Sequence, residues 1–286
     1  MNNHIVHSFA KLNLSLEVYA PKDGYHPLCS VFQTISLYDT LKIQTSSQFS
    51  GIRLSCNNPD IPTDHHNILV KIVEAYQDKI HLGLEIMLEK NIPVGGGLGG
   101  GSTNAAALLV WLNDTFQWGY SMEALAKMGA TFGSDVPFFF TGGSACVQGI
   151  GDKITSVLPG RHTHFLLINP QIMVSSGRAY KALDERGGFP EPGPIPEWML
   201  KNRVGYNSFK AWLWETYPEF QQLEEVAKSY GADELYLSGS GATTFLPFVH
   251  LEDALSYEAK LKQRYPHYWI KTVAAQPLGW FIKDSK

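Results

Sequence analysis

The chain has 286 residues, of which 44% are hydrophobic and 17% charged, and its formal net charge is −4. This length allows one large domain or two of ordinary size with a substantial core. The slightly acidic balance gives no reason to expect a nucleic-acid partner. No apolar run approaches membrane-spanning length, no signal-peptide pattern opens the chain, and the three cysteines are widely spaced. We therefore expect a cytoplasmic protein with reduced thiols and no membrane partner.

The first ninety residues are predicted to contain strands and one helix. Residues 9–18 alternate between apolar and polar, which predicts a strand that carries Lys11 and Asn13 on its polar face. A turn at 21–24 leads to further strands between residues 31 and 43. Apolar residues at helical spacing then predict a helix over 65–80, with Asp64 as its N-cap.

The most informative segment is the glycine loop, residues 95–101, in which six of the seven residues are glycine. Residues 82–89 before it alternate like a half-exposed antiparallel strand, and a helix is predicted to start at Ser102 after it. Glycine permits positive φ and a close approach to a ligand, while a helix N-terminus aims free N–H groups and a positive dipole end at the loop. The segment therefore predicts a phosphate-binding loop. A flexible linker is the alternative, but linkers seldom lie between a patterned strand and a patterned helix.

Two better-known phosphate loops are excluded by the residues around the glycines. A Walker A loop carries lysine before its serine, and here Gly101 precedes Ser102. Gly95, Gly97 and Gly100 satisfy a dinucleotide pattern, but a half-exposed strand is unlike the buried strand of a Rossmann unit. A nicotinamide-dependent oxidoreductase also needs an acidic residue after the next parallel strand, whereas the chain beyond residue 110 is predicted to be helical.

The second half of the chain begins after a helix predicted over 122–132 behind a Ser121 cap. Residues 149–152 interrupt the pattern and a new apolar strand starts at 165, so we expect two domains, 1–158 and 159–286. Four prolines between 184 and 198 predict a surface loop. A small α+β domain is predicted from helices near 207–229 and 252–264 and strands at 234–237, 243–249 and 269–275.

Three further segments could carry chemistry. Asp135 lies among apolar residues in Gly133-Ser134-Asp135-Val136-Pro137; a turn or cap aspartate is the commoner case, but an apolar setting is how enzymes tune a base. Tyr25 and His26 place an aromatic plane beside a hydrogen-bonding ring, with loop packing as the alternative. Residues 237–242 form a small-residue loop that is either a tight hairpin or a ligand contact.

Taken together and in chain order, these segments resemble the GHMP small-molecule kinases. The resemblance spans roughly residues 5–250 and rests on Ala10-Lys11-Leu12-Asn13-Leu14, the glycine loop, the segment around Asp135 and Ser238-Gly239-Ser240-Gly241-Ala242. The triple glycine after Leu98 and the turn Asp23-Gly24-Tyr25-His26 are similar to members that phosphorylate 4-diphosphocytidyl-2-C-methyl-D-erythritol. Two positions depart from that pattern: Ala20-Pro21-Lys22 stands where an arginine is usual, and Thr103 replaces a serine.

The resemblance implies an α+β, two-domain fold, with an N-terminal domain like the second domain of ribosomal protein S5 and a ferredoxin-like C-terminal domain. It implies transfer of the ATP γ-phosphoryl group to the 2-hydroxyl of the cytidylated substrate, giving the 2-phosphate and ADP, in the non-mevalonate (MEP) route to isoprenoid precursors. Mg²⁺ is expected on the ATP phosphates, with no dedicated metal ligands and Ser102 as the best protein contact. A monomer or weak homodimer is expected. The alternatives are a GHMP kinase of another alcohol, such as homoserine or mevalonate, and a non-catalytic ligand sensor of this fold.

The same resemblance assigns individual residues. Asp135 accepts or orients the substrate hydroxyl proton, and Lys11 neutralises the developing charge. The ATP-binding residues are expected to be Pro93, Val94, Gly95, Gly96, Gly97, Leu98, Gly99, Gly100, Gly101, Ser102, Thr103, Lys90, Asn67 and Asn113. The substrate-binding residues are expected to be Asn13, Tyr25, His26, Ser176 and Tyr180, with the His26 ring supplying a donor and an acceptor to the pyrimidine edge.

Overall fold

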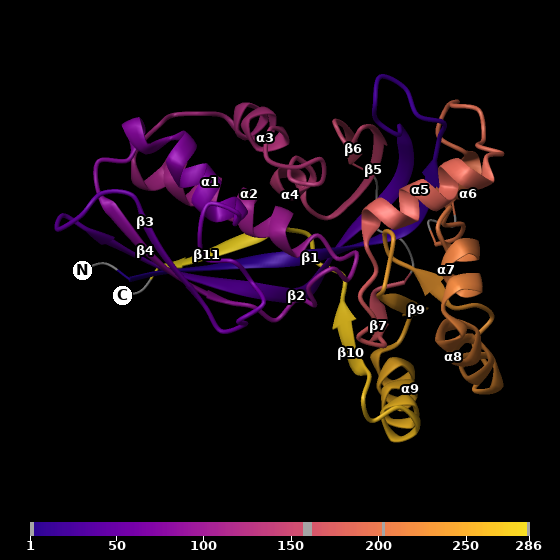
Figure 1. Ribbon diagram of the computed structural model, residues 1–286. Coiled ribbons are helices and arrows are strands. Elements are labelled where there is room, and N and C mark those ends of the chain that lie inside the picture. Colours follow the sequence, from indigo (N-terminus) through magenta and orange to yellow (C-terminus); the bar gives the residue numbers. More distant parts are fainter. Residues whose placement is uncertain (1–2, 157–161, 202–203, 285–286) are drawn as a thin grey trace.

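The computed structural model describes residues 3–156, 162–201 and 204–284, which form two lobes connected by long strands (Figure 1). In the first lobe the described strands form a seven-stranded sheet with the order β11-β1-β2-β4-β3, and β5 pairs with both β2 and β6. Its strands are β1 (Asn3–Val18), β2 (Leu28–Ser46), β3 (Ile52–Cys56), β4 (Gly83–Glu89), β5 (Ser144–Gly149), β6 (Lys153–Ser156) and β11 (Trp280–Asp284).

Helices of the first lobe lie on one face of this sheet (Figure 1). They are α1 (Ile68–Ala75), the short 3-10 helix η1 (Gln77–Lys79), α2 (Gly100–Thr115), α3 (Met122–Ala130) and α4 (Phe138–Thr141). β4 pairs antiparallel with β2 and parallel with β3, and its side chains alternate between buried and exposed as predicted. Ser121 caps α3, also as predicted, because its hydroxyl accepts a hydrogen bond from the Ala124 N–H at 3.2 Å.

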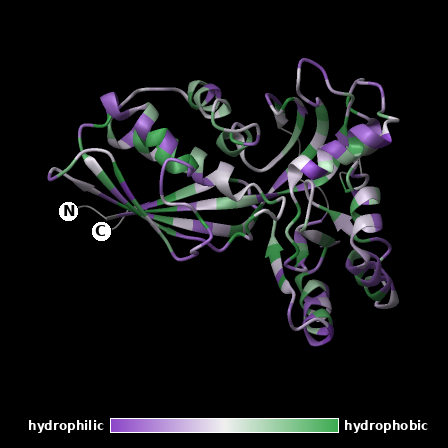
Figure 2. Ribbon diagram, in the orientation of Figure 1, coloured by the Kyte–Doolittle hydropathy of each residue, from purple (hydrophilic) through white to green (hydrophobic). Residues whose placement is uncertain are grey.

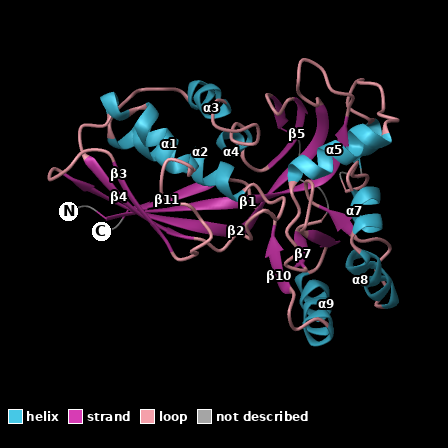
Figure 3. Cartoon of the chain, in the orientation of Figure 1, coloured by secondary structure: helices cyan, strands magenta, loops and turns pink. Residues whose placement is uncertain are grey.

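The second lobe is a four-stranded antiparallel sheet with helices against it (Figure 3). Its elements are β7 (His164–Asn169), α5 (Ser176–Arg186), α6 (Glu197–Lys201), α7 (Lys210–Thr216), α8 (Pro218–Ser229), β8 (Tyr236–Leu237), β9 (Thr244–Phe248), α9 (Leu251–Arg264) and β10 (Trp269–Ala274). The strand order β10-β7-β9-β8 is that of a ferredoxin-like unit, which confirms the fold expected for this lobe. Hydrophilic residues gather on the outer helices α8 and α9 (Figure 2).

Two helix boundaries differ from the sequence prediction. The N-cap of α1 is Asn67, whose Oδ1 accepts the Leu69 N–H at 2.9 Å, so the prediction of Asp64 was wrong. Asp64 instead accepts the His66 N–H one turn earlier. Helix α2 begins at Gly100 rather than Ser102, because Gly99 adopts φ +69° and acts as the N-cap. All residues from Thr103 to Asn113 are buried, so α2 is a central helix and not an amphipathic surface one.

The domain prediction needs one correction at the C-terminus. β11 pairs antiparallel with β1, so that Val6 lies opposite Ile282, and residues 280–284 therefore belong to the first lobe. Residues 159–286 as a whole are not the second unit, because the chain returns to extend the first sheet beside β1. The predicted boundary at residue 158 lies outside the described residues.

Strand β1 connects the hydrophobic cores of both lobes. Val6 packs in the core beneath α2, Leu12 in a central cluster, and Leu16 in the core of the second lobe. Its polar face is buried as well: Lys11 is 3% exposed and Asn13 is 2% exposed. Burying polar groups on a strand is costly unless partners satisfy them, and the partners of Lys11 and Asn13 form the candidate site, whereas the buried Ser15 hydroxyl on the same strand has no hydrogen-bond partner among the described residues.

Candidate active site

The glycine loop and the first turn of α2 form a cradle of backbone N–H groups. Residues 100–102 begin the helix, so their N–H groups have no carbonyl partner within it, and the first intrahelical bond runs from the Thr103 N–H to the Gly99 carbonyl at 2.9 Å. The positive end of the helix dipole adds to this donor array. Such a cradle suits phosphate oxygens. The phosphate loop predicted from the sequence therefore has the backbone it needs.

A cavity of about 310 Å³ opens over this loop. It is lined by residues 93–101 together with Ile61, Pro62, His66, Asn67, Ile68, Leu88, Lys90 and Asn104. The volume lies in the range of small-molecule sites, and the lining combines apolar side chains with a few polar ones. Pro93 through Gly101, Asn67 and Lys90, all predicted to bind ATP, thus line one cavity.

Lys90 brings an ammonium group to the loop from the end of β4. A Cβ on Gly100 would lie 2.7 Å from Lys90 Nζ, so this cation sits against the first turn of α2. Lys90 Nζ also donates to Asn104 Oδ1 at 3.3 Å and forms a buried ion pair with Asp39. The loop has no Walker lysine, and a lysine from a different element occupies the neighbourhood of its helix N-terminus.

Lys11 and Asp135 meet where the two lobes join. Lys11 Nζ lies 3.2 Å from Asp135 Oδ2 and donates to Asn13 Oδ1 at 2.5 Å. It also lies 4.5 Å from the centre of the Phe32 ring. The Lys11 side chain is 4% exposed whereas that of Asp135 is 30% exposed, so the ammonium is fixed from within and the carboxylate keeps an open side. The predicted catalytic pair is therefore in contact and accessible to a ligand through Asp135.

The two small-residue loops contact each other through Ser238. Its hydroxyl donates to the Gly97 carbonyl at 2.9 Å and accepts the Asn13 N–H at 3.1 Å. Gly97 adopts φ +73°, and a Cβ there would lie 2.1 Å from the Ser238 carbonyl oxygen. The loop at 237–242 is thus the partner of the glycine loop across the lobes. The sequence suggested a ligand contact or a hairpin for this loop, and gave no signal for Ser238 as the bridging residue.

His26, from the turn between β1 and β2, lies in an aromatic cluster against α5. Its ring packs on Tyr180 at 5.0 Å and on Phe189 at 5.7 Å between centroids. Its Nδ1 donates to the Tyr19 carbonyl at 3.0 Å, and its Nε2 lies 3.4 Å from Asp184 Oδ1. We expected the His26 ring to offer both nitrogens to a pyrimidine edge. In the structure Nδ1 is already bonded to the backbone, so the ring does not offer both.

Tyr25, the residue before His26, and Tyr180 on α5 differ in how far their rings are buried. Tyr25 is 65% exposed at the tip of the turn, so its ring is available to cover a ligand. Burial raises the pKa of the Tyr180 phenol, and the charge of Asp135 raises it further. Phe189 was not predicted; the only sequence signal was an aromatic residue beside Gly188 and Pro190 in the proline-rich segment.

The side chains of Ser176 and Thr103 hydrogen-bond to other elements, and that of Ser102 lies toward Gly133. Ser176 Oγ lies 2.9 Å from Ser240 Oγ, which attaches α5 to the second small-residue loop. Thr103 Oγ1 donates to the Gly279 carbonyl at 3.3 Å, so only its backbone faces the loop region. Ser102 Oγ would lie 3.8 Å from a Cβ on Gly133, which places this hydroxyl on the side of α2 that faces the Asp135 turn.

Asn113 is not part of the site. It lies thirteen residues beyond Gly100, which corresponds to about 20 Å along α2. Its Oδ1 accepts the Tyr120 N–H at 2.9 Å and its Nδ2 donates to the Tyr120 carbonyl at 3.3 Å. The ATP assignment of Asn113 is therefore wrong, and Asn104, one helical turn after Gly100, is the α2 asparagine that lines the cavity.

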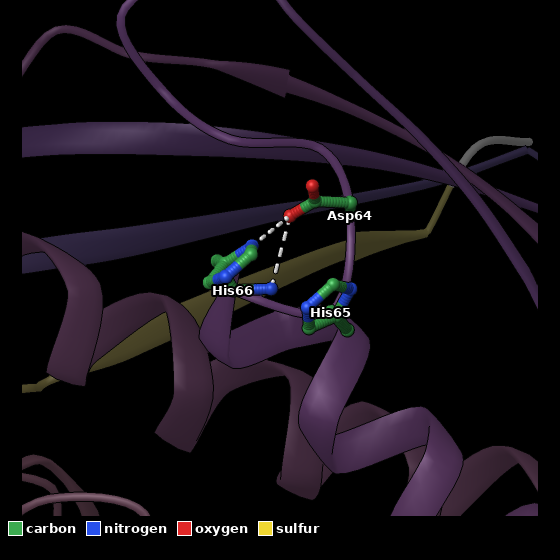
Figure 4. Close-up of side chains that lie close together, drawn as sticks. All are labelled: Asp64, His65 and His66. Carbon is green, nitrogen blue, oxygen red and sulfur yellow. Dashed lines mark hydrogen bonds and ion pairs between the residues drawn. The ribbon is translucent and has the colours of Figure 1, made fainter.

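Asp64, His65 and His66 form the group of potential metal ligands identified among the described residues, and all three are exposed (Figure 4). Asp64 Oδ1 accepts hydrogen bonds from the His66 N–H at 3.0 Å and from His66 Nδ1 at 2.9 Å. The His66 N–H and side chain lower the pKa of Asp64, so this carboxylate is ionised at neutral pH. Mg²⁺ prefers oxygen ligands and octahedral geometry, so two imidazoles and one carboxylate do not suit it.

Comparisons with known proteins give a consistent result. A profile described as "GHMP kinases N terminal domain" matches residues 67–143. A 4-diphosphocytidyl-2-C-methyl-D-erythritol kinase of Clostridium botulinum (strain Alaska E43 / Type E3) is 33% identical over 276 residues, which cover 93% of this chain and 98% of that protein. A crystal structure of 4-(cytidine 5'-diphospho)-2C-methyl-D-erythritol kinase aligns with a TM-score of 0.75 at 27% identity, covering 95% of this chain and 100% of the other.

A homoserine kinase from Cytophaga hutchinsonii ATCC 33406 aligns with a TM-score of 0.74 but only 16% identity, covering 99% of this chain and 98% of the other, and thus shares the fold. Over the part of the chain that the structure describes, every helix is too short or too polar to cross a bilayer.

Proposed function

Because the chain belongs to the 4-diphosphocytidyl-2-C-methyl-D-erythritol kinases of the GHMP kinase family, we propose that Lys11, Asp135 and the glycine loop together transfer the ATP γ-phosphoryl group to the 2-hydroxyl of that substrate. The products are ADP and the 2-phosphate, and the reaction belongs to the MEP route to isoprenoid precursors. The observation that supports these residue roles most is the contact of 3.2 Å between Lys11 Nζ and Asp135 Oδ2 at the lobe junction.

Asp135 is the group that receives or orients the proton of the acceptor hydroxyl. Its partly exposed carboxylate can reach a ligand, and the ammonium of Lys11 lies 3.2 Å from it. Lys11 is held by Asn13 and Phe32, so its charge is already oriented when negative charge develops on the transferred group. Phosphoryl transfer depends mainly on such positioning and charge stabilisation.

The nucleotide phosphates bind at the glycine loop. The free N–H groups of residues 100–102 supply hydrogen-bond donors, and Lys90 supplies a cation against the same helix turn. Mg²⁺, carried on the phosphates, supplies further charge neutralisation when bound. Oxygen donors suit this ion, and the Ser102 hydroxyl on the side of α2 that faces Asp135 is the group we assign to it.

The cytidine moiety binds at the aromatic cluster of His26, Tyr180 and Phe189, with the exposed ring of Tyr25, the residue before His26, available to cover it. Stacking of a base on an aromatic ring contributes about 1–3 kcal/mol. This cluster separates the proposed substrate from homoserine and mevalonate, which lack a base. Retention of both Lys11 and Asp135 in contact argues against a non-catalytic sensor. We also propose a cytoplasmic location, which the three free cysteines support.

A coupled phosphorylation assay tests the proposal. ADP release from ATP is measured with 4-diphosphocytidyl-2-C-methyl-D-erythritol and, in parallel, with 2-C-methyl-D-erythritol 4-phosphate, which lacks the cytidylyl group, with homoserine and with mevalonate. We expect turnover only with the cytidylated compound. Equal turnover of homoserine or mevalonate would favour the second kinase class, and binding of the cytidylated compound without ADP release would favour a sensor.

A further inference from the structure

The structure contains a completely buried carboxylate beneath the glycine loop that has no part in the mechanism above. Asp39, on β2, is 0% exposed and lies opposite Ser8 of β1 in the sheet. A buried carboxylate is costly unless donors surround it. The donors around Asp39 come from segments that build the nucleotide site, which suggests a role beyond holding the sheet together.

The first set of donors fixes the entry to the glycine loop. Asp39 Oδ1 accepts the N–H groups of Asn91 and Ile92, each at 2.8 Å. These two residues lie just after β4 and immediately before Pro93, where the lining of the nucleotide cavity begins. The carboxylate therefore fixes the backbone direction with which the chain leaves β4 and enters the loop.

The second set of donors fixes side chains that face the nucleotide. Asp39 Oδ2 forms the buried ion pair with Lys90 Nζ and accepts Asn104 Nδ2 at 3.0 Å. Asn104 Nδ2 also contacts Ser8 Oγ at 2.7 Å, and its Oδ1 accepts from Lys90 Nζ at 3.3 Å. Lys90 is 6% exposed at its side chain, so its ammonium has little freedom to find another position.

We propose that Asp39 is a positioning residue for ATP: its carboxylate holds the Lys90 ammonium at the N-terminus of α2 and the loop entry at Asn91 and Ile92. Four donors from the β4–α2 segment and from α2 converge on one group, so the loop backbone and the cation that serve the phosphates are oriented together. This inference rests on the proposed function, because it assumes that the phosphates bind at the glycine loop.

Steady-state kinetics of Asp39→Asn test the proposal. The substitution keeps the size of the side chain but removes the charge and one acceptor. We expect the KM for ATP to rise about tenfold or more, with the KM for the cytidylated acceptor unchanged within about twofold. The matched control is Glu224→Gln in the second lobe, where a carboxylate also receives several donors, from Lys210, Trp214 and Leu235. It should lower the melting temperature without changing the KM for ATP.

A double variant separates positioning from stability and serves if Asp39→Asn does not fold. Asp39→Asn with Lys90→Met removes both charges of the pair, which relieves the unpaired buried charge and should restore the melting temperature. Lys90 itself serves the phosphates, so Lys90→Met alone is measured beside the double variant. Under the proposal the two share the same raised KM for ATP, because the charge of Asp39 acts through the Lys90 ammonium, and different KM values for the two would contradict that coupling. A KM for ATP equal to that of the wild type, in Asp39→Asn or in the double variant, would overturn the inference. Turnover of the substrate with ATP by the wild-type enzyme would leave the proposed function intact. Failure of the wild type to use ATP would instead remove the proposed function itself.

Discussion

Substitution of Gly97 by alanine tests whether the contact between the two small-residue loops is required for activity. Gly97 lies at φ +73°, and a Cβ there would lie 2.1 Å from the Ser238 carbonyl oxygen and 3.3 Å from the Gly241 carbonyl oxygen. The left-handed backbone alone costs an alanine about 1–2 kcal/mol. The contact at 2.1 Å cannot persist, because the clashing atom belongs to the backbone and has no rotamer to change.

The size of the effect on catalysis follows from the required movement. The loops must separate by about 1 Å to restore an ordinary contact, and misplacement of this size near a reacting centre costs roughly 100-fold in rate. Ser238 also accepts the Asn13 N–H, so the movement is transmitted to the strand that carries Lys11. We therefore expect Gly97→Ala to lower kcat/KM about 100-fold and to reduce the free energy of unfolding by at least about 1–2 kcal/mol.

Gly101→Ala is the matched control for stability, since it makes the same change four residues away. A Cβ at Gly101 meets open space, and the residue lies in the first turn of α2, where alanine is favoured over glycine by up to about 1 kcal/mol. Thermal unfolding should show equal or higher stability for Gly101→Ala and lower stability for Gly97→Ala. If Gly97→Ala has the kcat/KM of the wild type in the coupled assay, activity does not require the present contact between the glycine loop and residues 237–242.

Three further results are expected. Asp135→Asn should lower kcat by at least about 100-fold, as loss of a general base does, while the Kd for ATP measured by equilibrium binding stays within a few-fold; wild-type turnover would remove the base assignment. Tyr25→Ala should raise the acceptor KM about tenfold without changing the melting temperature, because this ring is exposed and serves only the ligand; a change confined to ATP would contradict the assignment of cytidine to the aromatic cluster. Burial alone would raise the pKa of the Glu224 carboxyl, but the charge of Lys210 and hydrogen bonds from Lys210, Trp214 and Leu235 lower this pKa overall. The stabilisation that Glu224 provides is therefore present above its unfolded pKa near 4.3 and is lost as pH falls through its folded pKa. Melting temperatures from pH 7 to pH 3 should therefore fall less steeply for Glu224→Gln, and identical slopes would argue against this linkage.

Much of the fold could be predicted from local patterns. Strand alternation located β1 and β4, and the glycine loop located the start of α2 to within two residues. The strands, α7, α8 and α9 of the second lobe lie close to their predicted positions, whereas α5 and α6 were not predicted and overlap the ends of the predicted loop over 184–198. Local periodicity records which face of an element is buried, but not which partner covers it. For this reason β11 was missed as a strand of the first sheet: its pairing with β1 joins residues almost the whole chain apart.

The site could be predicted to the extent that its residues are near one another in the chain or belong to recognised motifs. Lys11 and Asn13 are bonded to each other, and the Lys11 N–H donates to the Leu98 carbonyl of the glycine loop at 3.0 Å, so these predicted segments lie together while their roles stay predictions. Asp39 was missed because a single aspartate in an alternating strand usually faces solvent, and nothing local indicates four donors from other elements. The error at Asn113 has a related cause: two asparagines lie on α2, and only the structure shows that Asn104 faces the cavity.

The burial of Lys11 supports the catalytic role that we propose for Lys11 and Asp135. Removing an ammonium and a carboxylate from water carries a desolvation cost that their attraction offsets only with good geometry, and apolar residues of similar size often stabilise a fold at least as well. Lys11 lies on a strand whose apolar face already joins three cores, so stability gives no reason for a cation there. The carboxylate partner keeps 30% of its side chain exposed, which a purely structural pair at a lobe junction does not need. A cation fixed from within beside an anion open to the ligand is the arrangement that phosphoryl transfer to a hydroxyl group requires.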